Sequence, residues 1–190
     1  MPRNVEIKAQ IDGDQFELLR NQVAKLATEG PFDLNQTDTF FHCHNGRLKL
    51  REFGDSTGEL IFYQRPDRTG PKTSSYVLSK CDPETMLAAL TGSNGVVGVV
   101  KKNRELFFIE QTRVHLDAVE GLGTFLELEV VLGENQTEES GEDIAKQILA
   151  KLNVADSCLI STAYIDLLSS SKNRLAPARK HASNSQIQLE

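Results

Sequence analysis

The chain has 190 residues, of which 39% are hydrophobic and 25% are charged, a composition typical of one globular domain with a substantial core. Its net charge of −6 and its pI of about 5.3 argue against a broad nucleic-acid-binding surface, although a local basic pocket is compatible with both. Cys43, Cys81 and Cys158 are widely spaced and form no Cys-x-x-Cys pair, so neither a disulfide framework nor a zinc site is indicated.

Hydropathy gives no sign of a membrane segment. The sequence has no run of about 18 apolar residues, and residues 1–6 lack the apolar stretch of a signal peptide. We therefore expect no membrane partner and no nucleic-acid partner, and a cytoplasmic location, with the nucleus as the alternative. A monomer and a homodimer both agree with the sequence.

The first half of the chain shows strand-like alternation separated by turn residues. In chain order it predicts a strand at 3–11, a helix capped by Asp12 or Asp14 and ended by Gly30-Pro31, strands at 36–44, 47–53, 59–65 and 72–78, and a short helix from Asp82 through Leu90. Asn45-Gly46 is a strong hairpin signal, so the strands on either side of it should pair in antiparallel fashion.

The second half continues the pattern and ends in helices. It predicts strands at 96–102, 104–109, 112–117 and 125–132, followed by helices at about 140–152 and 158–169. Residues 171–190 are small, polar and without period, which predicts a disordered tail after a domain of residues 1–170.

Three strands carry charge on one face and aliphatic residues on the other. In residues 125–132 the leucines alternate with Glu127 and Glu129, and the same alternation occurs in residues 4–8 and 46–51. A solvated outer face would explain one such strand, but three of them indicate a shared charged interior. The sequence thus predicts an α+β fold, a closed or nearly closed antiparallel barrel of about eight strands with flanking helices.

The expected interior residues are mostly basic. They are Glu6, Lys8, Arg47, Lys49, Arg51, Arg65, Lys72, Lys102, Arg104, Arg113, Asp117, Glu127 and Glu129. Buried charges on this scale are tolerable only in a wet lumen where they are paired or neutralised by a ligand. Because bases outnumber acids, the expected ligand is a polyanion, and the carboxylates would supply hard oxygen ligands for Mg²⁺ or Mn²⁺.

These residues resemble the CYTH family, named for class IV adenylyl cyclase and thiamine triphosphatase, whose fold is the triphosphate tunnel. The resemblance covers about residues 3–169. It is carried by Asn4-Val5-Glu6-Ile7-Lys8, by residues 46–51, by Arg65-Pro66-Asp67, by Lys102-x-Arg104, by the His115 to Gly123 segment and by Phe125-Leu126-Glu127-Leu128-Glu129. Asn4 departs from the family pattern, which has a glutamate at this position.

The resemblance implies a small-molecule triphosphate substrate and a role for each charged residue. Glu6, Glu127 and Glu129 would hold Mg²⁺, with Mn²⁺ as the alternative, and Glu6, Lys8 and Asp117 would be catalytic. Eight bases would contact phosphate: Lys8, Lys49, Arg51, Arg65, Lys72, Lys102, Arg104 and Arg113. We interpret Tyr164 as a core residue, and His42, His44 and His115 as structural.

The first functional hypothesis is a metal-dependent phosphohydrolase acting on tripolyphosphate or on an organic triphosphate such as thiamine triphosphate. The second is an adenylyl cyclase that converts ATP to cyclic AMP and pyrophosphate. The third is a polyphosphate or nucleotide binder without catalysis, because Asn4 lacks the negative charge of a glutamate.

Overall fold

The computed structural model describes residues 3–64 and 72–175. Arg65 lies outside the described residues, as do the side chain of Lys72 and the part of the predicted tail beyond Leu175. The elements are β1 (Arg3–Ile11), α1 (Gly13–Leu26), β2 (Glu29–Phe41), β3 (Arg47–Phe53), β4 (Gly58–Gln64), β5 (Lys72–Cys81), α2 (Pro83–Asn94), β6 (Val96–Ile109), β7 (Thr112–Val119), β8 (Gly123–Leu132), α3 (Glu138–Lys151), η1 (Asp156–Cys158), β9 (Leu159–Ile160) and α4 (Tyr164–Leu175).

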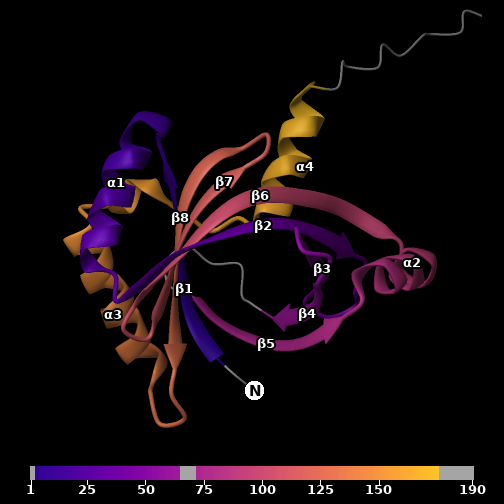
Figure 1. Cartoon of the computed structure of the whole chain (residues 1–190), viewed down its shortest axis with the longest axis horizontal. Helices are drawn as coiled ribbons and strands as arrows, with labels where there is room; N and C mark the ends of the chain where they lie inside the picture. Colours follow the sequence, from indigo (N-terminus) through magenta and orange to yellow (C-terminus); the bar gives the residue numbers. More distant parts are fainter. Residues whose placement is uncertain (1–2, 65–71, 176–190) are drawn as a thin grey trace, which may run out of the picture.

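Eight of the strands close into a barrel (Figure 1). Their order is β5-β4-β3-β2-β6-β7-β8-β1, and β1 also pairs with β5, which completes the ring, while the short β9 adds to the edge of β1. Every strand pair is antiparallel. The predicted α+β barrel is confirmed.

The aliphatic faces of the strands point outward and form the main core with two helices. Val5 and Ile7 on β1, and Leu126, Leu128 and Val130 on β8, are at most 3% exposed. They pack with buried residues of α1 and α3, which lie together on one side of the barrel (Figure 1). The opposite, charged faces of these strands are therefore left to line the interior.

Some element boundaries differ from the sequence prediction. Residues 96–109 form one strand, not two, because β2 pairs with β6 without a break through Asn35↔Asn103. The first helix ends at Leu26, and Gly30-Pro31 lies within β2 instead of ending the helix.

The last helix begins and ends later than expected. The residues before it form the 3-10 helix η1 and the strand β9, and the pairing of Leu159 with Ala9 explains the extended backbone of β9. The helix passes the predicted boundary at residue 171. Within it, Ser169 and Ser170 donate hydrogen bonds of 2.8 Å and 2.9 Å to main-chain carbonyls four residues earlier, which satisfies these polar side chains inside the helix.

The close approach of α3 to the barrel leads to a prediction about two glycines. A Cβ at Gly141 would lie 2.7 Å from both Leu132 Cδ2 and Val5 Cγ2, whereas a Cβ at Gly92 in α2 would meet nothing within 4 Å. Gly141→Ala should therefore lower the free energy of unfolding by about 1–3 kcal/mol. Gly92→Ala should raise it by about 0.4–1 kcal/mol, and urea titration of both variants compares the two effects. Equal effects at the two sites would contradict the packing described for α3.

Within the part of the chain that the structure describes, none of the helices combines the length and apolar character needed to cross a bilayer.

Candidate functional site

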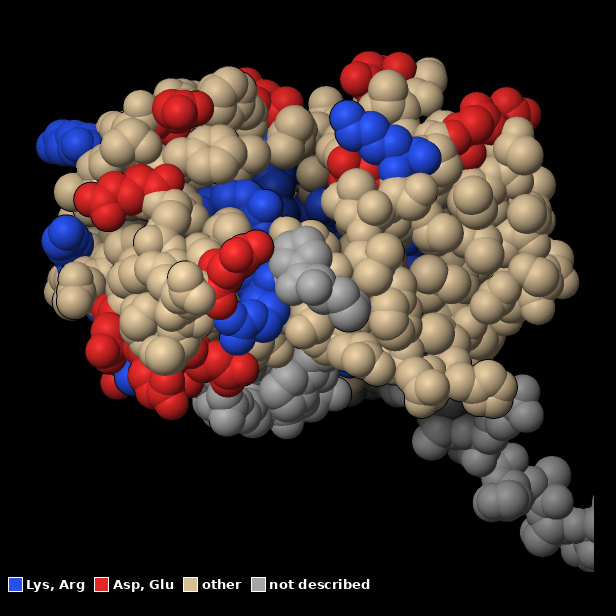
Figure 2. All heavy atoms as spheres, turned by 90° about the horizontal axis from the view of Figure 1, so that it is seen from below, with Lys and Arg blue, Asp and Glu red and all other residues tan. Residues whose placement is uncertain are grey.

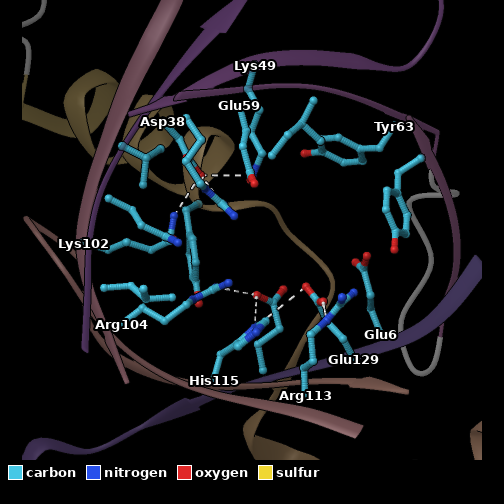
Figure 3. Close-up of a pocket in the computed structure, with 18 of the residues that line it drawn as sticks. Glu6, Asp38, Lys49, Glu59, Tyr63, Lys102, Arg104, Arg113, His115 and Glu129 are labelled. Atoms are coloured by element: carbon cyan, nitrogen blue, oxygen red, sulfur yellow. Dashed lines mark hydrogen bonds and ion pairs between the residues drawn. The ribbon is translucent and has the colours of Figure 1, made fainter. Parts of the chain in front are cut away.

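The barrel encloses a cavity of about 450 Å³, lined by residues of all eight barrel strands and by the start of α4. Figure 2 shows basic side chains within a hollow of the surface, and Figure 3 looks into the cavity itself. Among described residues, its bases are Lys8, Lys49, Arg51, Lys102, Arg104 and Arg113, and its acids are Glu6, Asp38, Glu59, Glu127 and Glu129. The predicted excess of bases shrinks to one among the described lining residues. Asp38 and Glu59 add two acids, Arg47 and Asp117 are not in the lining, and Arg65 and the side chain of Lys72 lie outside the described residues.

Three of the bases meet at one carboxylate, that of Asp38 on β2. Arg51 donates to Asp38 Oδ1 from Nε at 2.7 Å and to Oδ2 from Nη2 at 2.8 Å, while Lys49 and Lys102 reach Oδ2 at 3.0 Å and 2.8 Å. We call Asp38, Lys49, Arg51 and Lys102 the basic cluster. When all three bases are protonated, one negative and three positive charges leave the cluster with a surplus of two positive charges on the cavity wall.

Burial and charge act against each other in the basic cluster. Burial opposes ionisation of Asp38, but Arg51, Lys49 and Lys102 outweigh it and hold the pKa of this carboxyl well below its usual value. Burial lowers the pKa of Lys102 to about 7, even though Asp38 favours its charged form. Burial and Arg51 together lower the pKa of Lys49. An anion entering the cavity would favour the charged form of both lysines.

The shifted pKa of Lys102 predicts a pH dependence of polyphosphate binding. The charged form attracts phosphate, so with a folded-state pKa of about 7 its contribution is full below about pH 6 and falls as the pH rises through 7. Lys102→Arg stays charged across this range. The ratio of tripolyphosphate Kd values, natural protein over Lys102→Arg, should rise on the order of tenfold between about pH 6.5 and 8.5, as measured by calorimetry. Ionisation of the ligand affects both Kd values alike, so its effect cancels in the ratio. A ratio that stays constant with pH would contradict the prediction.

The opposite wall of the cavity carries acids from β8 with partners on β1 and β7. Strand register sets two rows, in which Glu129 lies between Glu6 and Arg113, and Glu127 lies between Lys8 and His115. Arg113 Nε donates to Glu129 Oε2 at 2.8 Å, and Lys8 Nζ lies 3.3 Å from Glu127 Oε1. We call Glu127, Glu129 and His115 the acidic cluster. Their ligand atoms all lie within 4.8 Å of one another.

Asp117 lies behind the cavity wall. It is 0% exposed, and its two oxygens accept hydrogen bonds of 2.6 Å from Arg104 Nε and Nη2, with a third of 3.0 Å from the Tyr164 hydroxyl. Arg104 Nη2 also donates to Glu127 Oε2 at 2.9 Å. Asp117 is not among the residues that line the cavity, and its hydrogen bonds hold the Arg104 guanidinium in place, while its expected catalytic role stays a prediction.

Tyr164 combines two environments. As expected, it is buried and packs on Phe125, with ring centroids 4.9 Å apart, but it also lines the cavity, and Lys8 Nζ lies 4.0 Å from the centre of its ring. Burial and the adjacent Asp117 raise the pKa of its hydroxyl well above the usual value, so it acts as a hydrogen-bond donor at neutral pH.

The acidic cluster offers a chemically suitable donor set for a divalent cation. Burial opposes ionisation of both glutamates, but Lys8 beside Glu127 and Arg113 beside Glu129 help to keep the pKa values of both carboxyls below their usual values. Two ionised carboxylates on adjacent rows of one wall fit the oxygen preference of Mg²⁺ and Mn²⁺. Glu6 also lines the cavity, but its carboxylate is not among the three groups that gather within 4.8 Å.

The structure brings most of the residues expected in the interior to one cavity. Besides Asp117, the cavity lining omits Arg47, which turns to α4 and forms a bidentate ion pair with Asp166 at 2.7 Å and 3.2 Å. Lys72 is opposite Glu6 in the β1 to β5 pairing. Sequence reasoning missed Asp38 and the position of His115. Strand alternation could have placed both residues in the cavity. Asp38 lies on the same strand face as Phe40, and His115 lies on the same face as Arg113 and Asp117.

The family model of the CYTH domain matches residues 2–164. The chain belongs to the CYTH family. A curated relative from Methanocaldococcus jannaschii, whose name marks it as a candidate adenylate cyclase, is 26% identical over 172 residues, which are 86% of this chain and 97% of the relative.

Solved structures share the fold of this CYTH protein. The PH1012 protein of Pyrococcus horikoshii matches with a TM-score of 0.77 at 22% identity over 86% of this chain and 98% of that one. A candidate adenylate cyclase of Vibrio parahaemolyticus matches with a TM-score of 0.70 at 18% identity, over 87% of this chain and 97% of that one. A Mimivirus capping enzyme triphosphatase matches with a TM-score of 0.56 at 13% identity, over 80% of this chain and 89% of that one.

Proposed function

We propose that the protein is a divalent-metal-dependent phosphohydrolase that acts on triphosphates. The observation that carries this proposal is the arrangement of the two clusters: the basic cluster on β2, β3 and β6 faces the acidic cluster on β7 and β8 across one cavity (Figure 3). The cavity volume of about 450 Å³ falls within the range of small-molecule sites, which is about 300–1,000 Å³.

The basic cluster supports binding of a phosphate chain. Asp38 uses one donor of Lys49, one of Lys102 and two of Arg51, so most of their N–H groups stay available for phosphate oxygens. Asp38 fixes the directions of the three side chains before substrate arrives, which reduces the entropy lost on binding. The surplus positive charge would neutralise phosphate oxygens and stabilise charge that develops on phosphoryl transfer.

The acidic cluster supports metal dependence. A divalent cation bound there would supply Lewis-acid polarisation of phosphoryl oxygens. Arg104 and Arg113 orient Glu127 and Glu129 through the hydrogen bonds described above. We expect Glu6 to orient the attacking water. Attack of this water on the terminal phosphorus breaks the bridging P–O bond and releases orthophosphate and a diphosphate.

Adenylyl cyclase activity is the second candidate, because the relatives from M. jannaschii and V. parahaemolyticus carry that name. In this reaction the ribose 3′-hydroxyl attacks the α-phosphorus of ATP, and pyrophosphate leaves. The same two clusters would hold the phosphate chain. Cyclic AMP and pyrophosphate formed in equal amounts from ATP would favour this activity over hydrolysis.

Binding without catalysis is the third candidate, and it rests on Asn4. This residue lines the cavity, is 3% exposed, and its Oδ1 accepts no hydrogen bond from any described residue. Tight tripolyphosphate binding without turnover, together with turnover gained by Asn4→Glu, would support a binder.

A triphosphate panel tests the proposal. Tripolyphosphate, thiamine triphosphate and ATP are each incubated with Mg²⁺ or Mn²⁺, and orthophosphate, pyrophosphate and cyclic AMP are measured separately. Hydrolysis predicts steady orthophosphate release from at least one of them. Absence of orthophosphate release from all three substrates would contradict the proposal.

A further inference from the structure

His115 is a buried side chain with an unused ligand atom. It lies on β7 opposite Glu127 of β8, is 4% exposed, and lines the cavity. Its Nδ1 is buried and makes no hydrogen bond with any residue that the structure describes. A buried imidazole nitrogen normally has a partner, so an unsatisfied one that faces carboxylates needs an explanation.

The distances around Nδ1 suggest what that partner is. Nδ1 lies 3.7 Å from Glu127 Oε2 and 3.8 Å from Glu129 Oε1, which is too far for a hydrogen bond. Two ligands that are each about 2.1 Å from one cation are about 3.0 Å apart at right angles and about 4.2 Å apart when opposite. Both distances from Nδ1 fall between these limits, and the ligand atoms of all three groups lie within 4.8 Å of one another, so one ion can lie among them after a small adjustment of the side chains.

We propose that His115 Nδ1, with Glu127 and Glu129, forms a mixed nitrogen and oxygen site that selects Mn²⁺ or a later first-row transition metal over Mg²⁺. Imidazole binds such ions well, whereas Mg²⁺ prefers oxygen ligands and water. This refines the metal site of the proposed function, but it concerns ligation alone and can fail while hydrolysis stands.

The surrounding cations support a site that is completed by substrate. Glu129 uses Oε2 for Arg113 and leaves Oε1 toward His115, while Glu127 Oε2 also accepts from Arg104 and Oε1 lies near Lys8. These contacts hold the carboxylates in place. They also place positive charge near the ion, so tripolyphosphate should strengthen metal binding.

Pulsed electron paramagnetic resonance of Mn²⁺ bound to the full chain tests the proposal without turnover. Samples contain Mn²⁺ alone and Mn²⁺ with tripolyphosphate, frozen at once. Coupling to a ¹⁴N nucleus is expected in the natural protein and should vanish in His115→Gln. His44→Gln, which changes an exposed histidine, is the matched control and should keep the coupling.

Calorimetry with each metal alone gives a second readout. His115→Gln should weaken Mn²⁺ binding by about 10–100-fold and change Mg²⁺ affinity by less than about threefold. Bound Mn²⁺ without nitrogen coupling overturns the proposal, as does an unchanged Mn²⁺ to Mg²⁺ affinity ratio or the absence of Mn²⁺ binding in both samples. The presence or absence of nitrogen coupling in the spectrum of the natural protein tests the proposal even if a variant fails to fold.

Discussion

Glu129→Gln should reduce triphosphate turnover by at least about 100-fold. The change removes one negative charge from the acidic cluster and leaves the Arg113 guanidinium, which donates at 2.8 Å, without its ionised partner. Because the amide keeps the size of the carboxylate, the barrel should stay folded. Orthophosphate release from tripolyphosphate under saturating Mg²⁺ or Mn²⁺ gives the change in kcat, and a thermal melt checks the fold.

Glu105→Gln is the matched control for Glu129→Gln. Glu105 also accepts from an arginine Nε, that of Arg20 at 2.7 Å, but it lies outside the cavity lining and its partner is on α1. It should retain turnover within about twofold, because a partly exposed ion pair contributes little. Full activity in Glu129→Gln would contradict the assignment of this residue to the metal site.

Asp38→Asn should destabilise the protein by about 3–5 kcal/mol, the typical cost of removing one partner from a buried ion pair. The variant leaves Lys49, Arg51 and Lys102 close together in a buried position without the carboxylate that they share. Tripolyphosphate should recover much of the loss, since its oxygens replace the missing negative charge and binding to the native state stabilises it. Urea unfolding with and without tripolyphosphate measures both effects.

Asp166→Asn supplies the comparison for Asp38→Asn. Asp166 pairs with Arg47 at 2.7 Å, but its side chain is 46% exposed, so the expected loss is at most about 1 kcal/mol. The account of the basic cluster would be wrong if the two variants lost similar stability, or if tripolyphosphate stabilised Asp38→Asn no more than Asp166→Asn.

Alternation along the strands made most of the barrel predictable. Leu126, Leu128 and Val130 could only share one face, which forced Glu127 and Glu129 onto the other, and this local geometry holds whatever the strand pairs with. The closing of the ring followed from the need to give these charged faces a common interior. The family resemblance added the roles of the residues, and those roles stay predictions.

Pairing across strands was not predictable to the same degree. The Asn45-Gly46 signal located the first hairpin, but its connection spans residues 42–46, and this length sets the register in which Asp38 faces Arg51. The basic cluster depends on that register.

The spacing of His115 along the chain matches no metal motif, so the sequence alone favours a structural interpretation of this residue. Its neighbours are brought close only by the β7 to β8 pairing, in which His115 lies opposite Glu127. Similarly, the Ser-rich end of α4 resembled a tail because its composition does not reveal the hydrogen bonds that Ser169 and Ser170 donate within the helix.

A crystal structure with Mn²⁺ and tripolyphosphate tests the central claim most directly, because Mn²⁺ is located by its anomalous scattering and the phosphate chain by its density. We predict a phosphate chain inside the barrel with oxygens bound by Lys49, Arg51 and Lys102, and Mn²⁺ bound on the opposite wall by Glu127 and Glu129. A phosphate chain that binds only on the outer surface, or a Mn²⁺ ion that avoids both glutamates, would contradict it.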